Sequence, residues 1–80
     1  MNKTYTKTIK RIFRKHQIPF SEIHIAQNET ETVYEVYLTK RVDVNQIIEA
    51  VNAVKTATVP EMRALVPIPD KNAIGLCFPK

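Results

Sequence analysis

Residues 65–80 read LVPIPDKNAIGLCFPK, a stretch in which apolar residues typical of strands alternate with residues that interrupt strands. Pro67 and Pro69 stand at alternate positions, and proline cannot donate a hydrogen bond to a sheet ladder. The strand that contains them is therefore predicted to lie at an edge of a sheet, or to end there. A turn over residues 69–72, which includes Lys71, separates it from the next strand.

That next strand, residues 73–78, contains the only glycine of the chain, Gly75. Glycine is unfavourable inside a strand, and its usual reasons there are a bulge or the close approach of another backbone. We expect one of these two at Gly75. Pro79 is then predicted to end the strand, because proline has no N–H to donate to the ladder and its ring fixes φ.

The sequence upstream predicts a helix followed by a β-hairpin. Apolar residues recur at helical spacing from Tyr5 to His16, and Pro19 disfavours a helical residue before it, so the helix should end near Gln17. Two runs of alternating or β-branched and aromatic residues, 21–27 and 31–39, then flank the turn-forming sequence NET.

A second helix is predicted from about Val44 to about Lys55, with Asp43 and Gln46 spaced as in a capping box. The run 61–68 is the proline-containing strand. The predicted order is thus α-β-β-α-β-β, an α+β domain with a largely antiparallel four-stranded sheet and two helices on one face.

Length and composition place these elements in a single domain over residues 1–80. No run approaches the roughly 18 apolar residues of a membrane helix, and no secretory signal is visible, so we expect a soluble chain without a membrane-spanning segment. One cysteine, Cys77, allows neither an internal disulfide nor a zinc site. We expect a cytoplasmic protein without a metal or cofactor.

Charge is concentrated on the first helix. Residues 1–20 carry six basic residues and no acid, whereas the remainder is slightly acidic and the whole chain has a net charge of +4. Such asymmetry favours a polyanion, either nucleic acid or an anionic membrane surface. The candidate phosphate-binding residues are Lys7, Lys10, Arg11, Arg14 and Lys15.

The closing stretch resembles a known family. VPIPDKNAIGLCFPK is similar to the APIPGK-AIGIEIPN segment that closes the small α domain of FtsK/SpoIIIE-type DNA translocases, directly before their RecA-like motor. The two prolines, Lys71, the Ile-Gly pair and Pro79 keep register with it. Upstream, ETVYEVYL is similar to the family's GPVVTRYEL strand, and VDVNQIIEAVNAV to its next helix, so the resemblance covers nearly the whole chain.

The resemblance implies a non-catalytic module. In that family the α domain stacks on the motor, forms the smaller ring of a hexamer around double-stranded DNA and helps to couple the subunits. The chain contains no G-x-x-x-x-G-K-[ST] loop, so ATP binding is expected of a motor in cis or in trans rather than of these residues. The interface positions that the resemblance implies are Pro67, Pro69, Lys71, Gly75 and Pro79.

Three positions depart from the family pattern. Asp70 replaces its glycine, Cys77 its acidic residue and Lys80 its final asparagine. These departures suggest a divergent branch, such as a translocase of a mobile genetic element.

Each candidate residue also has a structural interpretation. A basic helix face is often only a solvated surface, and His16 and His24 lack partners for a metal site. Tyr34 and Tyr37 lie on opposite faces of one strand, where core packing explains them more simply than base stacking. We expect Cys77 to be a buried small hydrophobic residue rather than a nucleophile.

Three functions remain open from sequence. The first is the translocase module, with double-stranded DNA bound weakly and without sequence specificity and with a homo-oligomer formed in the full assembly. The second is a free-standing DNA-binding protein that uses the basic helix. The third is an adaptor that docks a protein at the proline-marked edge by strand addition.

Overall fold

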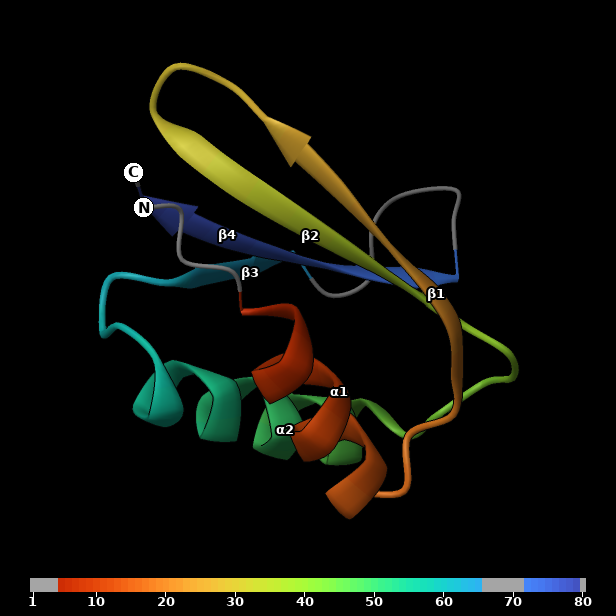
Figure 1. Cartoon of the computed structure of the whole chain (residues 1–80). Helices are drawn as coiled ribbons and strands as arrows, with labels where there is room; N and C mark the ends of the chain where they lie inside the picture. Colours follow the sequence, from red (N-terminus) through yellow and green to blue (C-terminus); the bar gives the residue numbers. More distant parts are fainter. Residues whose placement is uncertain (1–4, 66–71, 80) are drawn as a thin grey trace.

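The computed structural model describes residues 5–65 and 72–79. Its elements are α1 (Thr6–Lys15), β1 (Phe20–Gln27), β2 (Glu31–Leu38), α2 (Val44–Ala57), β3 (Arg63–Leu65) and β4 (Ala73–Pro79). All neighbouring strands are antiparallel, in the order β1-β2-β4-β3, and both helices lie on one face of the sheet (Figure 1). The predicted α+β class and element order are confirmed.

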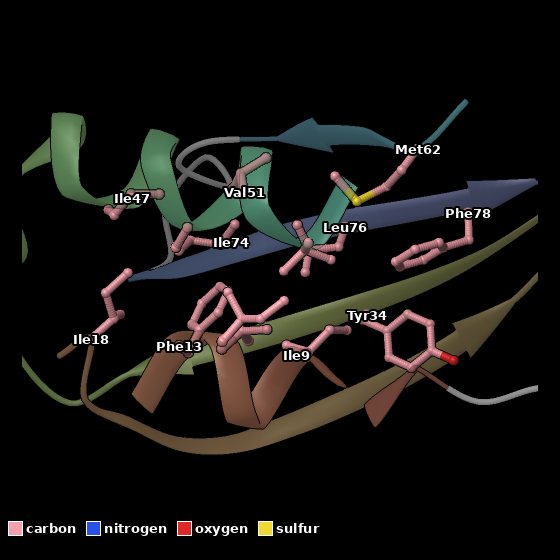
Figure 2. Close-up of a cluster of buried hydrophobic side chains, with 14 residues drawn as sticks. Ile9, Phe13, Ile18, Tyr34, Ile47, Val51, Met62, Ile74, Leu76 and Phe78 are labelled. Atoms are coloured by element: carbon pink, nitrogen blue, oxygen red, sulfur yellow. The ribbon is translucent and has the colours of Figure 1, made fainter. Parts of the chain in front are cut away.

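The core lies between the sheet and the helices. Ile74, Leu76 and Phe78 project from β4 toward the helices, and each is at most 2% exposed. Figure 2 shows them packed against side chains of β2 and of both helices, including Tyr34 and Phe13. Burial of an apolar side chain of this size stabilises a fold by about 1.5–3 kcal/mol, so β4 is the strand on which the two helices depend.

The β1–β2 hairpin forms where the turn sequence predicts it. The Asn28 side-chain oxygen accepts hydrogen bonds from the backbone N–H groups of Thr30 and Glu31, at 2.8 and 2.7 Å. This Asx turn closes the hairpin with the Asn28 N–H donating to the Glu31 carbonyl at 2.9 Å. The ladder is regular from Glu22 to Gln27 and shifts register only between Phe20 and Glu22.

The end of α1 agrees with the predicted stop near Gln17. Gln17 adopts a positive φ of 59°, its N–H donates to the Arg14 carbonyl, and the Ile18 N–H donates to the Phe13 carbonyl. These two bonds form a Schellman motif, whose left-handed residue is more often glycine or asparagine. Pro19 follows directly and prevents the helix from continuing.

The capping box predicted at the start of α2 is wrong in one half. The Asp43 carboxylate caps the helix by accepting from the Asn45 N–H at 2.8 Å. The Gln46 side-chain amide does not bond back to Asp43 but donates to the backbone carbonyls of His16 and Gln17, at 2.6 and 3.3 Å. Because α1 ends beside α2, Gln46 ties the two helices together.

The closing stretch gives a mixed outcome. β3 is an edge strand, as the prolines predicted, although Pro67, Pro69 and Lys71 themselves lie outside the described residues. Of the two explanations expected for Gly75, the bulge is wrong, because Gly75 pairs with Glu35 and with Leu65 in two ladders that pass through it without a change of register. β4 extends to Pro79, one residue beyond the predicted strand and at the predicted stop.

The central position of β4 predicts unequal costs for two leucine truncations. Leu76→Ala truncates a side chain of β4 that is 0% exposed in the core beneath the helices. Leu65→Ala truncates one that is 54% exposed on the face of the sheet away from the helices. We expect Leu76→Ala to lower the free energy of unfolding by about 2–5 kcal/mol and Leu65→Ala to lower it by less than about 0.5 kcal/mol. Urea denaturation measures both, and equal losses would contradict this arrangement of the core.

Candidate nucleic-acid interface

The candidate interface is the outer face of α1, which the core packing holds in one orientation. Ile9, Ile12 and Phe13 are buried against the sheet and the second helix. With 100° between successive residues, the remaining positions of the helix must then face away from the core. Apart from Thr6 and Thr8 these positions are basic, and the helix contains no acidic residue.

Both ends of α1 are anchored. At its start, the Tyr5 ring stacks on Phe78 with centroids 4.4 Å apart, and the Tyr5 N–H donates to the Tyr34 hydroxyl at 3.1 Å. At its end, the Schellman motif and the Gln46 amide fix the last carbonyls. The cations are therefore presented on a helix that is held at both termini, which lowers the entropy lost on binding.

The five predicted cations are all present on this face. Lys7, Arg11, Arg14 and Lys15 are exposed and Lys10 is half-buried. Among the described residues the ion pairs are His24 with Glu22 and Arg63 with Glu31, and neither involves a cation of α1. The face thus keeps its charge available for an anion.

The structure divides these cations into two groups. Lys10 and Arg14, one turn apart, line a cavity of about 610 Å³ between α1 and the start of β1. The Arg14 guanidinium carbon also lies 5.8 Å from the centre of the Phe20 ring, a cation–π contact. We call this cavity the α1–β1 groove. Lys7, Arg11 and Lys15 lie outside it. The sequence predicted the cations but not the groove, because its other wall depends on where β1 runs after Pro19.

The structure does not show the interface positions implied by the closing motif as one surface, because only Gly75 and Pro79 lie within the described residues. Gly75 is buried in the middle of the sheet, so it offers no side chain or open edge to a partner. Pro79 is exposed at the end of β4, opposite Glu31. Pro67, Pro69 and Lys71 stay predictions, since they fall outside the described part of the chain.

The two tyrosines of β2 lie on opposite faces, as predicted. Tyr34 is 2% exposed in the core, which confirms its packing role. Tyr37 lies on the face of the sheet away from the helices, where His24 contacts its ring edge-to-face at 4.9 Å. His24 is therefore on an exposed sheet face rather than in an apolar cluster, and its Nε2 lies 3.3 Å from a Glu22 carboxylate oxygen.

Neither the thiol nor the histidines form a catalytic or metal-binding cluster within residues 5–65 and 72–79. Cys77 is 7% exposed, and its burial raises the pKa of the thiol, with a smaller contribution from the Glu31 carboxylate. A raised pKa keeps the sulfur protonated and weakly nucleophilic. Beside the thiol, the Arg63 guanidinium donates a hydrogen bond to a Glu31 carboxylate oxygen at 2.6 Å, and this bond raises the pKa of Arg63. In the same part of the chain, no three potential ligands gather around a metal position.

No helix in the described ranges has the length and apolar character needed to cross a membrane. Comparison of the chain with protein-family models, with curated proteins and with solved structures gives no match.

Proposed function

We propose that this chain is a cytoplasmic, non-catalytic module that binds the backbone of double-stranded DNA through α1 and serves an ATP-driven translocase. The observation that carries the DNA part is the exposed, acid-free face of a helix anchored at both ends. The resemblance of residues 66–80 to the segment before a RecA-like motor supports the translocase part.

The dimensions of α1 suit a short run of phosphates. Its 10 residues span about 15 Å, the axial length of about four phosphates on one strand. Lysine and arginine bind phosphate through charge and hydrogen bonds that carry no sequence information. Binding should therefore be weak, independent of sequence and strongly dependent on salt.

The assembled ring supplies what the isolated module lacks. Each copy offers only a few phosphate contacts, so one module alone has modest affinity. Several copies held around one duplex would act together through their effective concentration. Homo-oligomerisation in the full assembly and a motor in cis or in trans are part of this proposal.

Reversing two charges on α1 tests the DNA contact. Lys7→Glu with Arg11→Glu is compared with Lys40→Glu and Lys55→Glu, a control that makes the same charge change at exposed positions outside α1 and also takes the net charge of +4 to zero. We expect affinity for a fluorescent 20-base-pair duplex to fall at least about tenfold in the α1 variant, because two phosphate contacts become repulsive.

The control variant should bind with nearly wild-type affinity at 50 mM salt. Raising salt to 200 mM should weaken wild-type binding by on the order of 100-fold if about four phosphates are contacted. Equal losses in the two variants would show that net charge, rather than the α1 face, attracts DNA.

The translocase part has its own test in the gene. We expect the reading frame to continue beyond Lys80 into a domain that contains G-x-x-x-x-G-K-[ST]. A stop codon directly after Lys80 would exclude a motor in cis and would leave a DNA-binding protein that acts alone or with a separate motor.

A further inference from the structure

The sheet has a second edge, β1, which is longer than β3 in the described part of the chain and lies on the opposite side of the sheet. All residues of β1 from Ser21 to Gln27 are exposed except Ile23, and Ile25 is 48% exposed. The register shift near Ser21 disrupts only the start of the strand, so Glu22 to Gln27 form a regular edge about 20 Å long. Such edges pair readily with another strand unless they are covered or charged.

The direction of the free hydrogen-bonding groups on β1 follows from the hairpin turn. The Asn28 N–H donates to the Glu31 carbonyl, so Asn28 and Glu31 form a hydrogen-bonded pair. In an antiparallel ladder these pairs alternate with pairs whose backbone groups point away from the partner strand. Counting back along the regular register, Ile23, Ile25 and Gln27 direct their N–H and C=O groups away from β2.

The side chains of Ile23 and Ile25 lie on the helix side of the sheet, because they pair with the buried residues Val36 and Tyr34. On this side the α1–β1 groove runs beside the start of the edge, and Lys10 and Arg14 form its basic wall. Among the described residues that line it, Glu22 is the one acid, and its Oε1 lies 3.3 Å from His24 Nε2. A strand added beside β1 would therefore place its helix-side residues near two cations and exposed isoleucine surface.

We propose that β1 binds an extended, acidic segment of another protein as a fifth strand of the sheet. Backbone pairing with Ile23, Ile25 and Gln27 provides affinity, and alternating acidic side chains that face Lys10 and Arg14 provide selectivity. A second copy of this chain fits the edge poorly, because joining two β1 strands would bring together two α1 helices that carry cations and no acids. This proposal does not rest on DNA binding, for which Lys7, Arg11 and Lys15 provide cations outside the groove.

Ile25→Pro tests the pairing directly. It removes an N–H that points away from β2 and leaves the β1–β2 ladder intact, whereas His24→Pro would remove a donor that the ladder uses. Ile25→Val is the matched control for loss of side-chain volume. The probes are the peptides acetyl-EVEVEVEV-amide and acetyl-KVKVKVKV-amide, titrated into the ¹⁵N-labelled chain.

The glutamate peptide should bind the wild type and Ile25→Val and should slow hydrogen exchange at the Ile23, Ile25 and Gln27 amides. Ile25→Pro should weaken that binding at least about tenfold. Lys10→Glu with Arg14→Glu keeps every backbone donor and should switch preference to the lysine peptide, which tests selectivity even if Ile25→Pro disturbs the fold. Lys7→Glu with Arg11→Glu should change peptide affinity by less than about threefold while it weakens DNA binding.

Four results would overturn the proposal. The first is equal binding of the two peptides by the wild type, and the second is peptide-dependent protection at β3 instead of β1. The third is self-association of the free chain that Ile25→Pro abolishes, which would assign the edge to a second copy. The fourth is protection of the β1 amides by duplex DNA and not by the glutamate peptide, which would assign the groove to nucleic acid.

Discussion

Burial of one face of β4 is the constraint on which the rest of the structure depends. β4 lies between β2 and β3, and Ile74, Leu76 and Phe78 place their side chains under both helices. A strand with neighbours on both sides cannot shift register without moving its apolar residues to the open face. The position of β4 therefore fixes which side of α1 is buried and which side carries its charge to solvent.

The surfaces available to a partner are those that remain outside the packed core, namely the outer face of α1 and the β1 edge of the sheet. Tyr5 and the Schellman motif hold the two ends of α1, and the sheet is left with β1 as its longer described edge. The basic face and the edge lie next to each other but serve different chemistry, because phosphates need charge whereas a strand needs unpaired backbone groups. If both proposals hold, one small module would engage DNA through cations of α1 and a protein partner through the backbone of β1.

The sequence predicted those parts of the fold that depend on neighbouring residues. It did not predict the contacts between residues far apart in the chain. Periodicity, turn residues and Pro19 were enough for the first helix and the hairpin, and Pro67 and Pro69 were enough for the edge position of β3. The role of Gln46 could not be predicted, since its carbonyl partners lie 29 and 30 residues away. For Gly75 the sequence left open a bulge or a close backbone approach, and only the pairing on both sides shows that the bulge is wrong. The candidate cations were visible in the sequence, but their division by the α1–β1 groove required the path of β1.

Chemical-shift mapping with a short duplex tests the central claim most directly. A 16-base-pair DNA is titrated into the ¹⁵N-labelled chain at 50 mM salt, and the amide and arginine side-chain resonances are followed. The account predicts changes confined to α1 between Lys7 and Lys15, with Arg11 among the largest, and their loss at 200 mM salt. Changes centred on the open sheet face around Tyr37, or no changes at low salt, would contradict it.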